Sequence, residues 1–140
     1  MYGHLYALES KSTLKMYHGI FSALSSKTMI SVYTTDPEYR KVFSTSKRMF
    51  LSKKPDEADI VLITNRSTLE SILKRNTINK NTKKPILFVT DYRLLKVSED
   101  TVGAFYWRKG RSQLLFIKKR LDKKNIQLPK AYQNFMIDEL

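Results

Sequence analysis

Apolar residues recur at helical spacing near the start of the chain. Leu14, Tyr17, Phe21 and Leu24 lie three or four positions apart, so they share one side of a helix. The polar residues between them fall on the opposite side. This spacing predicts an amphipathic helix over residues 12–24.

Three later runs of apolar residues predict strands. Residues 28–34 are rich in β-branched and aromatic side chains. Residues 59–64 and 85–90 are short continuous apolar runs, the kind of segment that is buried on both faces of a parallel sheet. We therefore expect the core of a mainly parallel sheet.

Helix-start signals separate these strands. Asp36 precedes Pro37, and an acidic N-cap followed by a first-turn proline is typical of a helix start. Ser67 begins a Ser-Thr-Leu-Glu run in which Glu70 completes a capping box. The polar, basic residues 75–84 predict a loop before the third strand.

The pattern changes in the last third of the chain. Residues 102–107 and 112–117 are two strand-like runs joined by a short Arg-Lys-Gly-Arg connection, which is typical of a β-hairpin. A basic helix is expected from Lys118, followed by an amphipathic turn around Tyr132 and Phe135.

Together these elements predict one α/β domain over residues 1–140. We expect a three-layer Rossmann-like sandwich with a mixed sheet of about five strands, closed by a C-terminal β-hairpin plus helix. A chain of 140 residues buries roughly two thirds of its unfolded surface, which is enough for one core.

The net charge narrows the choice of partners. Lys and Arg number 26 against 13 Asp and Glu, which gives a formal charge of +13. Such a surface attracts anions, so nucleic acid, an anionic envelope polymer or membrane, and an acidic protein are all candidates. No apolar run is long enough for a membrane span, so the chain is not expected to cross a membrane.

The cations concentrate at the predicted hairpin and the helix after it. Tyr106 and Trp107 precede them and would form a stacking platform for single-stranded nucleic acid if exposed. We expect instead that these aromatic residues belong to the core. The predicted partner-binding surface consists of Arg108, Lys109, Arg111, Lys118, Lys119, Arg120 and Lys123.

The sequence does not favour catalysis. His4 and His18 are the only histidines and have no acidic or hydroxyl partner nearby in sequence, and the chain has no cysteine. No glycine-rich phosphate loop occurs, so we expect no enzyme activity, no cofactor and no metal.

Polar residues at the strand ends leave one further alternative. Asp36, Asn65 and Asp91 each follow a predicted strand, where ligands bind in open α/β sheets. They are the candidate residues of a solute-binding domain. Asp36 and Asp91 also fall roughly where a receiver domain holds Mg²⁺, but an adjacent acidic partner is missing, so helix capping explains them better.

The C-terminal part of the chain resembles the YfiR-like family of small periplasmic proteins. The shared features are the proline-led strand at residues 85–90 with Asp91, the Gly110-Arg111 pair with Leu114 and Phe116, the helix through Leu121, and Ile126 with Leu128 before residues 132–136. The likeness extends back to the strand at residues 59–64. The chain departs from the family in lacking cysteines and in having Pro129.

This resemblance implies a bacterial, non-enzymatic protein of the cell envelope. It implies export to the periplasm after removal of a signal peptide, pairing with a second copy, and regulation of a membrane signalling protein such as a diguanylate cyclase. We therefore expect a regulatory or scaffolding protein that binds a membrane-associated protein partner. A cytoplasmic, basic nucleic-acid-binding domain is the main alternative.

Overall fold

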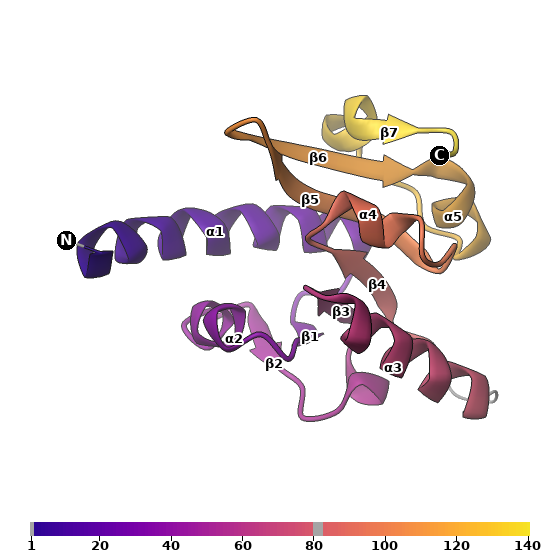
Figure 1. Cartoon of the computed structure of the whole chain (residues 1–140), viewed down its shortest axis with the longest axis horizontal. Helices are drawn as coiled ribbons and strands as arrows, with labels where there is room; N and C mark the ends of the chain where they lie inside the picture. Colours follow the sequence, from indigo (N-terminus) through magenta and orange to yellow (C-terminus); the bar gives the residue numbers. More distant parts are fainter. Residues whose placement is uncertain (1, 80–82) are drawn as a thin grey trace.

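The computed structural model describes residues 2–79 and 83–140, with side chains described from Ser10 onward. Helices, strands and short 3-10 turns alternate through most of the chain (Figure 1). In chain order they are α1 (Tyr2–Leu24), β1 (Ile30–Tyr33), α2 (Pro37–Phe43), β2 (Met49–Leu51), η1 (Pro55–Glu57), β3 (Ile60–Ile63), α3 (Arg66–Ile78), β4 (Ile86–Val89), α4 (Tyr92–Leu95), β5 (Thr101–Arg108), β6 (Arg111–Ile117), α5 (Lys118–Lys123), η2 (Lys130–Phe135) and β7 (Met136–Ile137).

The strands form one mixed sheet in the order β2-β1-β3-β4-β5-β6-β7. Neighbours from β2 to β5 are parallel, β5 and β6 are antiparallel, and β7 runs parallel to β6. The predicted α/β sandwich with a mixed sheet and a C-terminal hairpin is confirmed. The described sheet has seven strands rather than about five, because β2 and β7 add short edge strands.

The buried apolar residues that the structure describes form two clusters, one on each face of the sheet. Ile60 and Leu62 of β3 face a core that α1 and α2 cover, whereas Val61 and Ile63 face a second core with α3 and α4. This alternation follows from the two-residue period of a strand, and all four side chains are fully buried. The sheet therefore has helices on both faces, as the continuous apolar runs predict.

The helix starts agree with the sequence signals at one site and differ at another. Asp36 caps α2, because its Oδ1 accepts hydrogen bonds from the backbone N–H groups of Glu38 and Tyr39 at 2.9 and 3.3 Å. The cap of α3 is Asn65, not Ser67 as the capping-box pattern predicts. The backbone N–H of Thr68 donates to Asn65 at 2.9 Å, so the helix begins two residues earlier.

Two helical segments differ from the expected boundaries. Helix α3 continues to Ile78, so the first part of the predicted loop at residues 75–84 is helical. Residues 80–82 of that loop lie outside the described residues. The short helix α4, which the sequence pattern did not predict, begins directly after its N-cap Asp91.

The hairpin between β5 and β6 has a two-residue turn. Lys109 and Gly110 have φ values of 52° and 78°, the left-handed conformations that a type I′ turn requires at both positions. Gly103 lies further down β5, where a Cβ atom would lie 2.6 Å from the carbonyl oxygen of Leu115. The two strands are thus closely packed at the base of the hairpin, and the predicted hairpin is confirmed.

Candidate functional site

The hairpin turn lies at the edge of the sheet where the parallel strands end. Strand β5 is parallel to β4, so its last residue, Arg108, lies at the same edge as the carboxyl ends of β1, β3 and β4. The turn points toward the same end of the molecule as the start of α1 (Figure 1). We call Trp107, Arg108, Lys109 and Arg111 the hairpin tip.

The hairpin tip exposes its charges and one aromatic ring. Arg108, Lys109 and Arg111 are exposed, and none of them forms an ion pair with a side chain that the structure describes. The side chain of Trp107 is 70% exposed. The tip thus combines a large flat apolar surface with three adjacent cations.

The exposure of Trp107 corrects the expectation that the aromatic residues of this strand belong to the core. Phe105 packs against Tyr17 of α1, with ring centroids 5.9 Å apart, and is half-buried. Tyr106 contacts Tyr92 on the opposite face and is also half-buried. Trp107 comes next, at the end of the strand, where its ring is largely uncovered.

The lysines of α5 differ from those of the tip because each has a carboxylate partner. Lys118 pairs with Asp122 at 2.9 Å, Lys119 with Glu139 at 2.8 Å, and Lys123 with Glu99 at 3.7 Å. The hydrogen bonds with these carboxylates raise the pKa of Lys118 and of Lys119 above the ordinary value. The partly neutralised face of α5 is therefore a weaker anion-binding surface than its sequence predicts.

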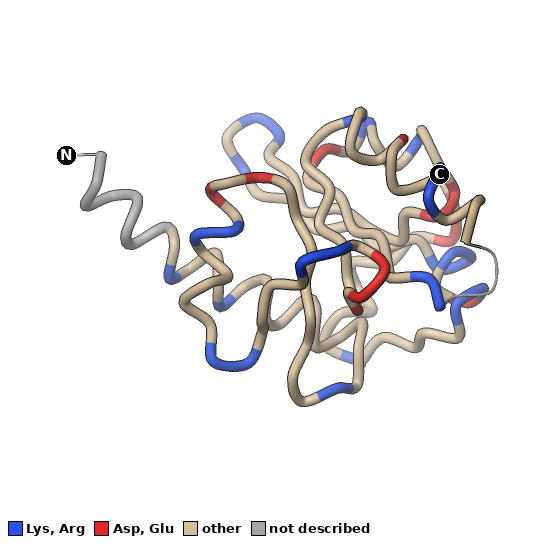
Figure 2. Tube along the Cα trace, turned by 90° about the horizontal axis from the view of Figure 1, so that it is seen from below, with Lys and Arg blue, Asp and Glu red and all other residues tan. Residues whose placement is uncertain are grey.

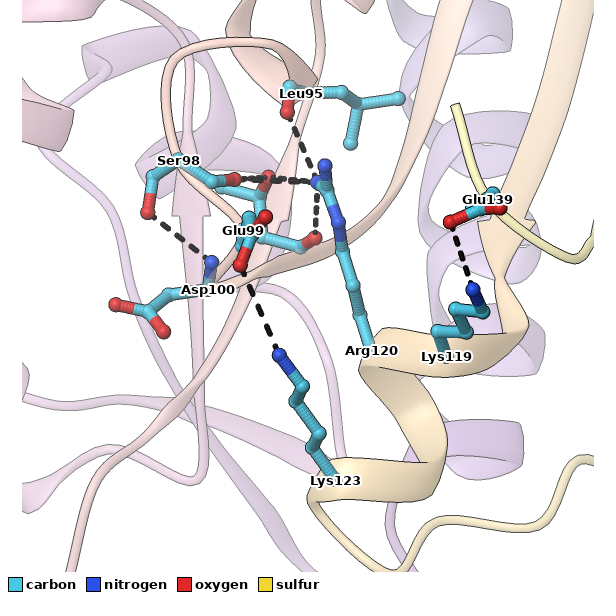
Figure 3. A network of polar contacts seen from close by, with 9 residues as sticks. Leu95, Ser98, Glu99, Asp100, Lys119, Arg120, Lys123 and Glu139 are labelled. Carbon is cyan, nitrogen blue, oxygen red and sulfur yellow. Dashed lines mark hydrogen bonds and ion pairs between the residues drawn. The ribbon is translucent and has the colours of Figure 1, made fainter.

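Arg120 is held inside the fold (Figure 3). Its Nη1 donates to the backbone carbonyls of Leu95, Ser98 and Thr101 at 2.9, 3.2 and 3.0 Å, and it lies 3.2 Å from the Thr101 hydroxyl. Burial lowers the pKa of Arg120, and the negative charge of nearby Glu99 partly offsets this decrease. The guanidinium thus joins α5 to the segment between α4 and β5. Arg120 therefore has a structural role, and we exclude it from the contact surface that the sequence predicts.

The three strand-end residues act as helix caps. Asp36, Asn65 and Asp91 each accept a backbone N–H at the start of α2, α3 and α4. Asp91 also pairs with Arg93 at 2.8 Å, and the Arg93 hydrogen bond lowers the pKa of Asp91. Each of these residues thus already has a side-chain oxygen engaged in a helix cap.

A cavity of about 610 Å³ lies at this edge of the sheet. Of the three predicted ligand-binding residues, Asp91 lines it, whereas Asp36 and Asn65 are not among its lining residues. The structure therefore does not bring these three residues together around one cavity. The lining residues are Thr64, Thr90, Asp91, Tyr92, Arg93, Tyr106, Trp107 and Arg108.

A second cavity lies on the other side of Trp107, and the sequence analysis missed it. It has a volume of about 550 Å³ and lies between α1, α2 and the hairpin. Tyr17 and Tyr39 line it with Phe105 and Trp107. The aromatic residues were visible in the sequence, but their meeting around one space depends on how α1 and α2 pack on β5.

Among the described side chains, the histidines and acidic residues outside these cavities are not arranged as a proton relay or a metal site. The expectation that His18 has no hydroxyl partner is wrong, because its ring lies 3.4 Å from the Ser22 hydroxyl, one helical turn away. His18 has no carboxylate partner among the described side chains, and the side chain of His4 lies outside that description. No group of three or more His, Asp or Glu residues that could hold a metal ion occurs in the described part of the chain. Within the same part, no helix is long and apolar enough to cross a membrane.

Positive charge is not confined to the hairpin. Figure 2 shows Lys and Arg in several loops and helices around the trace, with Asp and Glu between some of them. The hairpin tip is distinguished by an exposed Trp beside cations that pair with no described carboxylate, rather than by the number of its charges.

Comparison of the chain with protein-family models, with curated proteins and with solved structures finds no match.

Proposed function

We propose that this chain is a non-enzymatic regulatory or scaffolding protein of the bacterial cell envelope that binds a protein partner through the hairpin tip. The observation that carries the proposal is the exposed Trp107 beside Arg108, Lys109 and Arg111. Trp and Arg are the residue types that contribute most often to binding energy at protein interfaces. The proposed contact surface is smaller than the surface that the sequence predicts. It excludes α5, whose lysines pair with carboxylates and whose Arg120 binds backbone carbonyls.

The charges of the tip indicate an acidic surface on the partner. Because the three cations have no ion-pair partner among the described residues, a partner carboxylate would not have to displace an internal one. Charge complementarity of this kind mainly increases the rate of association and selects the partner. Burial of Trp107 would supply apolar contact area at the centre of the interface.

The resemblance to the YfiR-like family supports the envelope setting. The segments that carry the resemblance form β4, the hairpin, α5 and the C-terminal turn. That resemblance implies a periplasmic protein, one that pairs with a second copy and controls a membrane signalling protein such as a diguanylate cyclase. Fractionation of cells that express the gene from its own start would test the location, and recovery in the cytoplasm would contradict it.

Two charge-reversal variants test the contact surface. The first changes Arg108, Lys109 and Arg111 to Glu, and the matched control changes Lys118, Lys119 and Lys123 to Glu. A photo-crosslinking residue at position 113, on the exposed part of β6, reports the partner in cells of the native organism.

We expect the tip variant to lose the crosslinked protein and the α5 variant to keep it, with both variants folded by circular dichroism. Loss of the crosslink in the α5 variant alone would show that the partner contacts α5 rather than the hairpin tip. Equal amounts of crosslinked partner in the unmodified chain and in both variants would show that the hairpin tip does not contact the partner.

A nucleic-acid-binding domain is a second candidate, favoured by one observation. Trp107 is 70% exposed beside Arg108, as in sites where bases stack on an aromatic ring next to a cation. Titration of oligo(dT) at several salt concentrations would test this candidate. Three phosphate contacts predict a log–log salt slope of about −2 for single strands. Absence of binding at low salt would exclude it and leave protein recognition.

A further inference from the structure

A segment that combines cations with an exposed aromatic ring also lies at the β2 side of the molecule. Strand β2 is an edge strand of the described sheet, and β1, β3 and β4 separate it from the hairpin (Figure 1). Residues 47–54, which contain β2, read Lys-Arg-Met-Phe-Leu-Ser-Lys-Lys, so two cations precede the apolar strand and two follow it. We call residues 47–54 together with Met29 the β2 edge.

The alternation of β2 turns Phe50 away from the core. Met49 belongs to the buried cluster under α1 and α2, and Leu51 packs against the same cluster. Since successive side chains of a strand point to opposite faces, Phe50 lies on the other face of the sheet, where it is 49% exposed. Met29 immediately precedes Ile30, whose partner in the sheet is Met49, and its side chain is 47% exposed. Two large apolar side chains are thus exposed at this edge.

The cations of the β2 edge face solvent on both sides of Phe50. All four are exposed and pair with no carboxylate that the structure describes: Lys47, Arg48, Lys53 and Lys54. Asp56, which follows the segment, binds Arg75 at 3.1 Å. The Arg75 hydrogen bond lowers the pKa of Asp56, and the charge of Lys54 makes a smaller contribution. The edge therefore presents positive charge to an external anionic surface.

The backbone of β2 is poorly suited to pairing with a strand of another protein. The strand has only three residues, and the backbone N–H of Met49 donates to the Ser46 hydroxyl at 3.0 Å. A short edge strand flanked by lysines is a common protection against strand addition. Apolar side chains flanked by Lys and Arg instead match the boundary between the headgroups and the acyl chains of an anionic membrane.

We propose that the β2 edge docks this protein onto the surface of a membrane that contains anionic phospholipids. Phe50 and Met29 enter the boundary region, and the four cations contact the lipid phosphates. The long stems of Lys and Arg let their charges stay at the headgroups while the apolar side chains go deeper. This inference goes beyond the proposed protein partner and does not rest on it, because it uses none of the residues of the hairpin tip.

Vesicle sedimentation tests the contribution of the cations. The full chain is mixed with vesicles of phosphatidylcholine, either alone or with about one third phosphatidylglycerol, at physiological salt, where charges more than about 8 Å from the lipid are largely screened. One variant changes the four cations of the β2 edge to Gln. The matched control removes the same charge from exposed positions elsewhere, by changing Lys11, Lys15, Lys96 and Lys130 to Gln.

We expect the unmodified chain to bind the anionic vesicles and not the neutral ones. The edge variant should bind at least about 100-fold more weakly, because each basic residue near an anionic membrane strengthens binding roughly fivefold. The control should stay within about threefold of the unmodified chain. An equal loss in both variants would show attraction by net charge alone and would overturn the proposal.

Fluorescence tests the insertion of the apolar side chains without any charge substitution. Phe50→Trp combined with Trp107→Phe places the sole indole of the chain at the β2 edge. Its emission should shift to shorter wavelength on anionic vesicles and be quenched by lipids with brominated acyl chains, whereas Trp107 of the unmodified chain should be quenched much less. Absence of quenching at position 50, or stronger quenching of Trp107, would overturn the proposal.

Two further measurements complete the test. The melting temperatures of the edge variant and of the control should stay close to that of the unmodified chain, because every substituted side chain is exposed. The quenching result stands by itself if the edge variant folds poorly. Binding of a soluble poly-Glu peptide at physiological salt, with none to the anionic vesicles, would assign the β2 edge to an acidic protein segment and contradict membrane docking.

Discussion

The hairpin tip and α5 are basic segments that lie at opposite ends of β6, and their cations have different surroundings. Arg108, Lys109 and Arg111 extend from a turn and have no ion-pair partner among the described residues. In α5, Lys119 pairs with Glu139, and Arg120 is surrounded by backbone carbonyls. A run of basic residues in the sequence therefore does not by itself define a binding surface.

The difference arises from the three-dimensional contacts. The carboxylates that meet Lys119 and Lys123 come from Glu139 and Glu99, which lie about twenty residues away along the chain. The hairpin turn, in contrast, extends from the sheet, and its basic side chains remain exposed. The comparison predicts that substitutions of basic residues should have graded effects on stability, according to how deeply each cation is built into the fold.

The largest effect is expected for Arg120→Ala. Loss of the guanidinium leaves the carbonyls of Leu95, Ser98 and Thr101 without its hydrogen bonds, so the free energy of unfolding should fall by about 2–3 kcal/mol. Urea denaturation measures the change, with Arg108→Ala as the control. Equal stability of the two variants would show that Arg120 is not structural.

A somewhat smaller effect is expected for Asp59→Asn. Asp59 accepts from Lys27 at 2.6 Å and from the backbone N–H of Ser31 at 2.9 Å. Burial would raise the pKa of Asp59, but these bonds outweigh it and hold the pKa below the ordinary 3.8. At pH 7 the substitution should lower the free energy of unfolding by about 1.5–2 kcal/mol.

The destabilisation caused by Asp59→Asn should decrease at acidic pH. Because the folded pKa of Asp59 is lowered, its contribution is present above the ordinary pKa and is lost as the pH falls through the folded pKa. The stability difference between Asp59→Asn and the unmodified chain should therefore shrink below about pH 4. Urea denaturation between pH 3 and 7 measures it, and a constant difference would contradict the assignment.

A small effect is expected for Lys119→Met on the exposed face of α5. The Lys119 hydrogen bond lowers the pKa of Glu139, so its carboxylate should protonate at a lower pH than an ordinary Glu. Lys119→Met should move this pKa back up and change stability little, because both side chains are largely exposed. NMR titration of the Glu139 carboxyl carbon measures the shift, and an unchanged pKa would show that the pair does not form.

The smallest effect is expected at the hairpin tip. Replacing Arg108, Lys109 and Arg111 with Gln removes mutually repelling charges and breaks no described ion pair, so the melting temperature should stay the same or rise slightly. Calorimetry measures it. A marked loss of stability would show that the tip serves the fold rather than a partner.

Much of the fold could be predicted because local signals decide it. The apolar run at residues 59–64 contains β3, and Asp36 with Pro37 marks the start of α2. Strands β2 and β7 were not predicted, because three and two residues are too few to establish an alternation. The start of α3 was misplaced because Asn65 and Ser67 are both good caps, and only the backbone geometry selects between them.

The candidate site was predicted less completely, for physical reasons. The exposed cations of the tip are adjacent in sequence and follow from the hairpin pattern. The alternation of the strand places Phe105 and Trp107 on one face, but Phe105 lies under α1 whereas Trp107 remains largely uncovered. The hydrogen bonds of Arg120 to the carbonyls of Leu95 and Ser98 join segments more than twenty residues apart in the sequence, which no local pattern encodes.

The short strand β7 has a consequence for behaviour at high protein concentration. It pairs with Phe116 and Ile117, the two most buried residues of β6, and so covers the apolar end of that strand. The rest of β6 begins with the exposed Arg111, and charged edges resist pairing with another sheet. Strand β7, which consists of Met136 and Ile137, therefore covers the part of β6 that would pair most readily with another sheet.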